Sequence, residues 1–279
     1  MDTTRDTKIL PFMCWAGGKQ RLKNTLLKYA PDNFNNYFEP FVGAGSLFLA
    51  MAPTRALLND SNPALICTWK ALRDDLDTFC THLENIDLDY LTSPDPKTCY
   101  YFYKALYNKR FADKVFDAHT GALFLFLIKH CYNGTYRVDA QGNFNTTYNS
   151  KLVHSFTREH LEQIAKVLQG IDITCGDYID ACVSVAADDF VYFDSPYVSI
   201  CKSKYRLYNK KGFSDDDHKR LAELFSDLAH KGAYCMLSQH DTPFVRKLYR
   251  SWRIREVQVR RSIDMIHPHL VNEVIVTNY

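Results

Sequence analysis

The pattern of hydrophobic and polar positions begins as an open α/β sheet. An apolar strand over residues 37–41 leads into a glycine turn at 42–45, followed by an apolar helix over 46–52 and a second strand over 55–58. Open sheets of this kind bind ligands at the carboxyl ends of their strands, where the first turns lie. We therefore predict a ligand site near these turns.

The alternation of strands and helices stops in the middle of the chain and returns after Phe156. Residues 63–131 have helical periodicity, and extended stretches at 136–139 and 143–148 predict a β-hairpin. The candidate core positions in this part are Leu106, Phe116, Leu123 and Leu127. Later helices are expected at 157–168 and 214–229, and later strands at 172–175, 190–193, 233–237, 253–259 and 271–277.

These elements predict one α/β domain, formed by residues 1–62 and 151–279, with a mostly helical insert at 63–150 that carries the hairpin. Hydrophobic residues make up 46% of the chain and charged residues 24%, which excludes a disordered or collagen-like protein. The high aromatic share, 14%, suits core packing and stacking on bases equally well.

Charge is informative through its distribution, because the net charge is only +2. Two stretches are basic: one holds Lys202, Lys204, Arg206, Lys210 and Lys211, and the other Arg246, Lys247, Arg250, Arg253, Arg255, Arg260 and Arg261. A solvated surface explains either stretch by itself. Together they are the places where phosphate contacts are expected.

Cysteine usage and hydropathy predict an intracellular, cytoplasmic protein. The nine cysteines cannot all pair and show no C-x-x-C spacing, which indicates a reducing compartment. Residues 1–8 are polar and do not predict a signal peptide. The longest apolar run, 122–128, is too short to span a bilayer, so no membrane association is expected.

The glycine turn and the acid after the second strand form the first candidate site. Glycines between a strand and a helix let a ligand approach the backbone, although Phe48 occupies the third glycine position of a dinucleotide motif. Asp60 could accept both ribose hydroxyls of an adenosyl ligand. A purely structural turn and a helix N-cap are the alternatives, but the neighbouring segment Ser61-Asn62-Pro63 can supply that cap and leave Asp60 free for the ligand.

The sequence Asp194-Ser195-Pro196-Tyr197 is the second candidate site. It follows the apolar strand 190–193, so a carboxylate, a constrained turn and an aromatic ring lie at the edge of the sheet. Asp194 and the carbonyl of Ser195 could accept N–H bonds from a planar amine and localise its lone pair, while Tyr197 stacks on the base. A strand-terminating turn is the alternative for this motif alone.

The order of the motifs is more specific than any one of them. Trp15-x-Gly17-Gly18-Lys19 precedes the glycine turn, Asp60 and the Asp194–Tyr197 motif. This order resembles the Dam family of DNA adenine-N6 methyltransferases, the α group or D12 class. The resemblance covers nearly the whole chain and includes 124–127, 132–134, Arg137, 142–144, 238–242 and 259–262. It implies a Rossmann-like, S-adenosylmethionine-dependent methyltransferase sheet with an inserted DNA-recognition domain.

The resemblance also implies roles for individual residues. Trp15, Lys19, Glu39, Phe41, Gly43, Gly45, Asp60, Asp177 and Asp194 are expected to contact S-adenosylmethionine, with Lys19 near its carboxylate, Asp60 on the ribose and Asp177 on the adenine amino group. The catalytic turn is Asp194, Ser195, Pro196 and Tyr197. DNA contacts are expected from Tyr132, Asn133, Thr135, Arg137, Lys204 and Arg260, with Tyr132 wedging between base pairs.

Three features depart from the family pattern. Ser195 replaces a proline; the backbone carbonyl is retained, so we expect activity to survive with a less constrained turn. Cys14 stands where Dam proteins carry a basic residue, and Thr146-Thr147-Tyr148 replaces a proline-containing run. Because the last two positions belong to base recognition in the family, GATC is only the default target.

The predicted function is site-specific methylation of adenine N6 in double-stranded DNA, with the base flipped out of the helix. An enzyme acting on RNA or on a protein glutamine amide, and a DNA-binding homologue without catalysis, are the alternatives. No metal is required, because the sulfonium supplies its own electrophile, and no obligate protein partner is inferred. For His240 and Asp241 a loop or capping role is favoured over catalysis.

Overall fold

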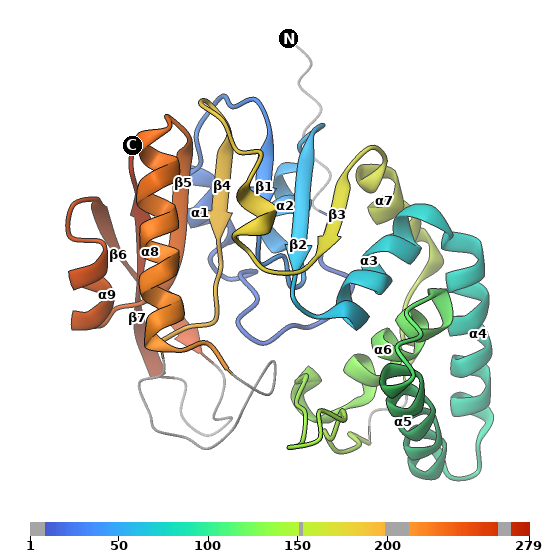
Figure 1. The fold of residues 1–279 in the computed structure, drawn as a ribbon. Coiled ribbons are helices and arrows are strands. Elements are labelled where there is room, and N and C mark those ends of the chain that lie inside the picture. The colour runs from blue at the N-terminus through green and yellow to red at the C-terminus, as the bar shows by residue number, and fades with distance from the viewer. Residues whose placement is uncertain (1–8, 151–152, 199–211, 262–268) are drawn as a thin grey trace.

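The computed structural model describes residues 9–150, 153–198, 212–261 and 269–279. Within these residues, seven strands form one sheet with the order β3-β2-β1-β4-β5-β7-β6 (Figure 1). The strands are β1 (Tyr37–Glu39), β2 (Ala56–Asp60), β3 (Asp172–Cys175), β4 (Phe190–Phe193), β5 (Tyr234–His240), β6 (Arg253–Arg261) and β7 (His269–Thr277). Strands β1 to β5 are parallel, and β7 runs antiparallel between β5 and β6.

The α/β class predicted from the sequence is therefore confirmed, and the sheet is consistent with a methyltransferase fold. Strands β3 and β4 have the predicted bounds, whereas β5 continues to His240, three residues further than expected. His240 consequently lies on a strand and not in a loop or cap. The short helix α9 (Pro243–Leu248) was not predicted.

The sheet buries both of its faces because successive side chains of a strand point to opposite sides. Tyr37 and Phe190 face one core, and their neighbours Phe38 and Val191 face the other. Helices α1 to α7 contribute to the first core, and α8 and α9 to the second. The helices are α1 (Lys23–Tyr29), α2 (Ser46–Met51), α3 (Pro63–Asp74), α4 (Leu76–Thr92), α5 (Pro96–Ala112), α6 (Ala118–His130), α7 (Arg158–Leu168) and α8 (Asp215–His230).

Helices α4, α5 and α6 stand together beyond the β3 edge of the sheet (Figure 1). The apolar run 122–128 lies on α6 and is completely buried among its neighbours. Leu123 and Leu127 are core residues as predicted, and Leu106 is half-buried. Phe116 is not a core residue: it is 37% exposed on the connection before α6, where its ring packs against that of Phe111.

Helix α3 joins this helical group to the sheet. Its N-terminus is capped by Asn62, whose side chain accepts the N–H groups of Ala64 and Leu65, as the sequence predicted. On one side Thr68 bonds the carbonyl of Gly121 on α6. On the other, Arg73 bonds the carbonyl of Ile171 just before β3. Helix α3 is therefore bonded both to the group of helices α4 to α6 and to the edge of the sheet.

The predicted hairpin exists as a tight turn with little strand pairing. Only two isolated antiparallel bridges occur, Val138 with Phe144 and Cys131 with Tyr148. The Asp139 carboxylate accepts the N–H groups of Gln141 and Asn143 and closes the turn. Side-chain bonding to the backbone competes here with a regular ladder, which explains why two full strands do not form.

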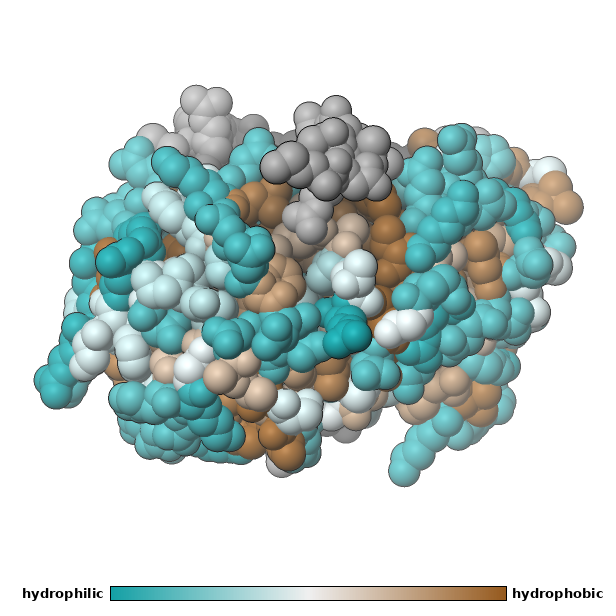
Figure 2. Space-filling model, turned by 90° about the horizontal axis from the view of Figure 1, so that it is seen from above, coloured by the Kyte–Doolittle hydropathy of each residue, from teal (hydrophilic) through white to brown (hydrophobic). Residues whose placement is uncertain are grey.

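Figure 2 shows one face on which hydrophobic side chains are divided into separate patches by hydrophilic ones. Among the described residues, no helix has the length and apolar character needed to cross a bilayer.

Candidate active site

The turns after β1, β2 and β3 are tied together at the carboxyl edge of the sheet. The buried Asn59, near the end of β2, donates from its amide to the carbonyls of Pro40 and Gly176, at 3.0 and 3.1 Å. Thr174 on β3 donates to the same side chain at 2.9 Å. Three of the predicted ligand segments are therefore held by a single residue that the sequence analysis did not identify.

The glycine turn requires its glycines. Gly43 and Gly45 have φ angles of +48° and +63°, which side chains rarely adopt. A Cβ atom at Gly43 would lie 2.7 Å from the Trp15 ring, and one at Gly45 would lie 2.8 Å from Trp69. The Trp69 indole on α3 also donates to the Gly43 carbonyl at 3.0 Å. Two tryptophans thus enclose the turn where the sequence predicted close approach of a ligand.

Asp60 lies next to this turn and anchors it. One carboxylate oxygen accepts the N–H of Gly43 at 3.2 Å and the other accepts the N–H of Asn62 at 3.0 Å. Burial raises the pKa of Asp60 to about 6, and these N–H groups oppose the rise. The carboxylate can accept further hydrogen bonds, so it combines a structural role with its predicted role as ribose acceptor.

Glu39 at the end of β1 is a buried acid. The Tyr37 hydroxyl donates to it at 2.8 Å. Burial raises the pKa of Glu39 to about 8; the Tyr37 bond opposes this rise and the nearby Asp194 charge adds to it. In the ligand-free protein this side chain therefore favours the neutral form.

Glu39→Gln should remove a pH dependence of stability. The ordinary pKa of glutamate is 4.5 and the folded value is about 8, so the folded chain binds more protons between these values and its stability falls as pH rises through them. Each pKa unit by which the folded value exceeds the unfolded value corresponds to about 1.4 kcal/mol in the free energy of unfolding. We expect the melting temperature of the variant to fall less than that of the native chain between pH 5 and pH 8.

The control is Glu223→Gln, at an exposed position on α8. It should keep the native pH dependence. Parallel pH curves for the native chain and Glu39→Gln would contradict the interpretation that Glu39 is held neutral.

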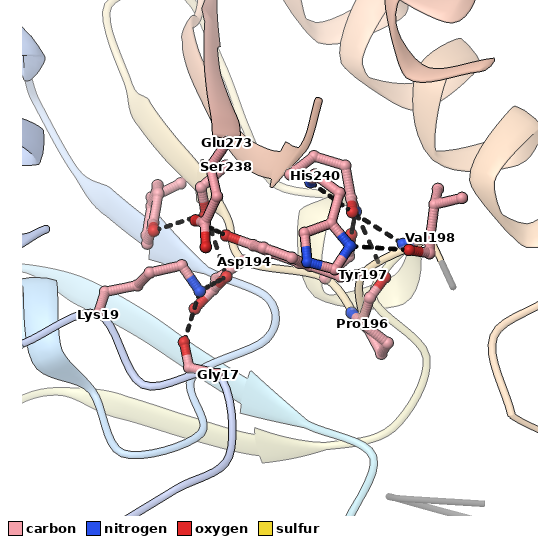
Figure 3. Close-up of polar contacts among 12 residues, drawn as sticks. Gly17, Lys19, Asp194, Pro196, Tyr197, Val198, Ser238, His240 and Glu273 are labelled. Atoms are coloured by element: carbon pink, nitrogen blue, oxygen red, sulfur yellow. Dashed lines mark hydrogen bonds and ion pairs between the residues drawn. The ribbon is translucent and has the colours of Figure 1, made fainter. Parts of the chain in front are cut away.

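Asp194 lies in a polar network at the end of β4 (Figure 3). The Lys19 ammonium forms an ion pair with Asp194 Oδ1 at 2.5 Å and also donates to the Gly17 carbonyl. Ser238 donates to the same carboxylate oxygen at 3.1 Å, and its hydroxyl lies 2.9 Å from that of the buried Tyr192. Burial raises the pKa of Asp194, and the Lys19 charge opposes the rise.

The ring of Tyr197 is held on several sides. Its hydroxyl donates to Glu273 Oε2 at 2.8 Å, and Glu273 on β7 is buried. The His240 ring packs edge-on against it with 4.7 Å between centroids. The Lys19 ammonium lies 4.5 Å from the ring centre, so the same cation contacts both Asp194 and Tyr197.

The structure brings the two parts of the predicted site together. Trp15 contacts the glycine turn, while Lys19, four residues later, contacts Asp194. The Phe41 ring packs on the ring of Tyr178, with 5.0 Å between their centroids. Tyr178 is the residue after Asp177, so this contact places the glycine turn beside the Asp177 segment. The Asp177 side chain is 44% exposed. It accepts the N–H of Ile179 at 2.9 Å.

Four of the six predicted DNA-binding residues lie on the segment that follows α6. Tyr132 and Asn133 are exposed, and Asn133 has a φ of +56°. Thr135 is half-buried and its carbonyl accepts from Thr146, while Arg137 bonds Asn145 at 2.9 Å. Tyr136, within the same loop, stacks on Trp15 at 5.8 Å. Lys204 lies outside the described residues, and only the backbone of Arg260 is described.

Comparison with known proteins decides the family. The profile described as "D12 class N6 adenine-specific DNA methyltransferase" matches residues 15–263. The chain belongs to this family.

The methyltransferase is similar over nearly its full length to curated relatives. The Type II methyltransferase M.MjaIII of Methanocaldococcus jannaschii is 33% identical over 273 residues, which cover 92% of this chain and 93% of the relative. The Type II methyltransferase M1.LlaDCHI of Lactococcus lactis subsp. cremoris is 31% identical over 278 residues, 96% and 95% of the two chains. The DNA adenine methylase of Escherichia coli K12 is 28% identical over 254 residues, 91% and 88%.

The predicted family, enzyme class and DNA substrate are thereby confirmed. Membership of a methyltransferase family also implies S-adenosylmethionine as the methyl donor in general terms. The methyltransferase therefore acts on adenine N6 in DNA, and the individual roles of its residues follow from the geometry above as proposals.

Sequence reasoning missed several partners of the site. Tyr37, Asn59, Ser238, Gln239 and Glu273 bond the predicted residues or the turns that carry them, and Tyr192 in turn bonds Ser238. The sequence held one signal for Glu273, a carboxylate directly before the apolar run 274–276 of an expected strand. Such a residue is rarely buried without a partner, and its partner here is Tyr197.

Proposed function

We propose that the methyltransferase acts site-specifically on duplex DNA, flips the target adenine out of the helix and methylates it at the Asp194–Tyr197 turn. The position of Lys19 carries this proposal. Its ammonium bonds Asp194 and lies over the Tyr197 ring, so an N–H donor is held by a carboxylate and covered by an aromatic face. An exocyclic base amine requires the same two partners, and a stacked base cannot reach them.

Within this mechanism the chain activates a poor nucleophile. The adenine N6 lone pair is delocalised into the ring, and N–H bonds to Asp194 and to the Ser195 carbonyl localise it. Tyr197 stacks on the base, and Glu273 holds the Tyr197 hydroxyl. Lys19 bonds Asp194 Oδ1 at 2.5 Å, so adenine and the lysine compete for this carboxylate, and we expect the lysine to give up the contact when the base enters.

The residues at the carboxyl edge suit S-adenosylmethionine, which supplies the electrophilic methyl group when bound. Its ammonium, ribose hydroxyls and adenine amino group are hydrogen-bond donors, and the edge offers the carboxylates Glu39, Asp60 and Asp177. Burial raises the pKa of Glu39 and Asp60, and a cationic ligand beside them would favour their charged forms. The proposed binding residues are Trp15, Lys19, Glu39, Phe41, Gly43, Gly45, Asp60, Asp177 and Asp194.

Residues 63–150 are proposed to recognise the DNA target. Tyr132 is 59% exposed on the loop after α6, which suits a ring that wedges between base pairs. Asn133, Thr135 and Arg137 lie on the same loop and carry polar groups for base edges and phosphates. The default target is GATC.

A methylation assay with matched acceptors tests the proposed function. Duplex DNA containing GATC, duplexes with other adenine sites, structured RNA and a glutamine peptide are compared at equal concentrations. We expect N6-methyladenine in duplex DNA alone, and mapping of the modified adenines gives the target sequence. Transfer to RNA or peptide would favour the other amine acceptors, and binding of DNA and cofactor without product would indicate a homologue that has lost catalysis.

Affinity for DNA should fall steeply with salt. Each neutralised phosphate contributes a slope of about −0.9 to the plot of log affinity against log salt concentration. Charge reversal at Lys204 or Arg260 should remove one phosphate contact and so make the slope less steep by about 0.9. The preferred sequence should not change, because phosphate contacts carry no sequence information. The slope is measured by fluorescence anisotropy. An unchanged slope would indicate that these basic residues belong to a solvated surface and do not contact phosphates.

A further inference from the structure

The carboxyl end of β5 extends beyond its pairing with β4 and lies along the Asp194–Tyr197 turn. The last paired residues are Phe193 and Leu237, yet β5 continues through Ser238, Gln239 and His240. Each of these three side chains contacts the segment 194–198. Since neighbouring side chains on a strand point to opposite faces, Gln239 reaches the turn from the side opposite to Ser238 and His240.

Gln239 makes the largest number of these contacts. Its side chain is 1% exposed, and its amide oxygen accepts the N–H groups of Val198 at 2.8 Å and His240 at 3.0 Å. Its amide nitrogen donates to Ser195 Oγ at 3.3 Å and to the Pro196 carbonyl at 3.4 Å. Both ends of the turn are therefore joined to one buried amide.

The orientation of this amide follows from its partners. A backbone N–H can only donate, so Val198 and His240 must face the oxygen of Gln239. The nitrogen then points to Ser195 and Pro196, whose hydroxyl and carbonyl oxygens can accept. Ser195 is itself 2% exposed, so its hydroxyl has no access to bulk water and depends on this partner.

We propose that Gln239 is a positioning residue for methyl transfer, acting through the hydroxyl of Ser195 to fix the turn that carries Asp194 and Tyr197. This rests on the proposed function of that turn. A serine leaves the backbone less restricted than a proline ring would at this position, and the Gln239 amide supplies the missing restraint through hydrogen bonds. The carbonyl of Ser195 and the carboxylate of Asp194 are thereby held in the geometry that the reacting amine requires.

The test compares Gln239→Met, Ser195→Ala and the double variant in the full chain. Methionine keeps the length of the side chain and removes all four hydrogen bonds. We expect the single-turnover rate of methyl transfer to fall about tenfold to a hundredfold in Gln239→Met, because small displacements of reacting groups cost rates of this order. Ser195→Ala removes one hydrogen bond and should cost about threefold to tenfold.

Measurements of ligand binding distinguish a positioning role of Gln239 from a general loss of structure in the variants. The dissociation constants for S-adenosylmethionine and duplex DNA should stay within about twofold of the native values, since none of the removed hydrogen bonds is a ligand contact. Gln163→Met, at an exposed position on α7, is the matched control and should leave rate and melting temperature unchanged. If Gln239→Met does not fold, Ser195→Ala decides the question alone.

The double variant tests whether the two residues act as a unit. If Gln239 works through the serine hydroxyl, adding Ser195→Ala to Gln239→Met should lower the rate no further. Multiplying losses, or a native rate in either single variant, would overturn the proposal. A native chain that methylates no DNA would instead overturn the proposed function, so the two failures are distinguishable.

Discussion

Asp194→Ala should lower the rate of methyl transfer by about a hundredfold to a thousandfold, the usual loss when one preorganised hydrogen-bond partner of a reacting group is removed. The DNA affinity should stay nearly unchanged, because the carboxylate acts on the amine and not on the phosphates. Single-turnover kinetics with labelled S-adenosylmethionine give the rate, and anisotropy gives the affinity. An Asp194→Ala enzyme with native turnover would refute the mechanism.

Two further variants are needed to interpret Asp194→Ala, because Asp194 is also the ion-pair partner of Lys19. Removing Asp194 leaves the Lys19 ammonium, 5% exposed, without its ion-pair partner, so part of any loss could come from the lysine. Asp194→Asn keeps the shape and one acceptor and should lose less activity than alanine. Asp227→Ala, at an exposed position on α8, is the control for aspartate removal and should be fully active.

Asp60→Ala should weaken S-adenosylmethionine binding by about tenfold to a hundredfold, the range expected for losing hydrogen bonds to a charged group. Two causes act together, since the carboxylate is the proposed ribose acceptor and also holds the N–H groups of Gly43 and Asn62. Calorimetry without DNA measures the affinity directly. Asp172→Ala, at the exposed start of β3, is the matched control and should bind normally. An unchanged affinity would remove Asp60 from the site.

The affinity should also fall in acid. Burial raises the pKa of Asp60 to about 6, so the carboxylate gains a proton as pH drops through that value and loses acceptor capacity. Calorimetric titrations at pH 5 and pH 7.5 give the comparison. Asp60→Asn has no such group to titrate, and its remaining affinity should change less between the two values.

The sequence predicted the elements best where short apolar runs end in a chemically distinctive residue. Strands β3 and β4 have the expected bounds, and Asp194 follows β4 immediately. The glycine turn and the cap by Asn62 were also predictable, because φ angles and capping are decided by neighbouring residues. Local rules suffice where local interactions determine the structure.

The partners of the site were beyond such rules. Glu273 reaches Tyr197 only because β7 inserts between β5 and β6 in the sheet, a pairing that no local pattern reveals. Gln239 lies in the segment 238–242 that the resemblance included, but it was given no role in the site because the strand was expected to end at Leu237. Phe116 was misjudged because apolar character does not tell a core position from a connection that packs on one ring.

Helix α3 limits where the proposed recognition region could be exchanged between relatives. Trp69 on this helix closes over Gly45 and bonds the Gly43 carbonyl, so α3 forms one wall of the glycine turn although it follows residue 62. A chimaera joined before Pro63 would carry a foreign indole against the native turn. Joining after Asp74 would keep this wall native, and the grafted part would then have to retain the rings at positions 124 and 136 that pack on Trp15.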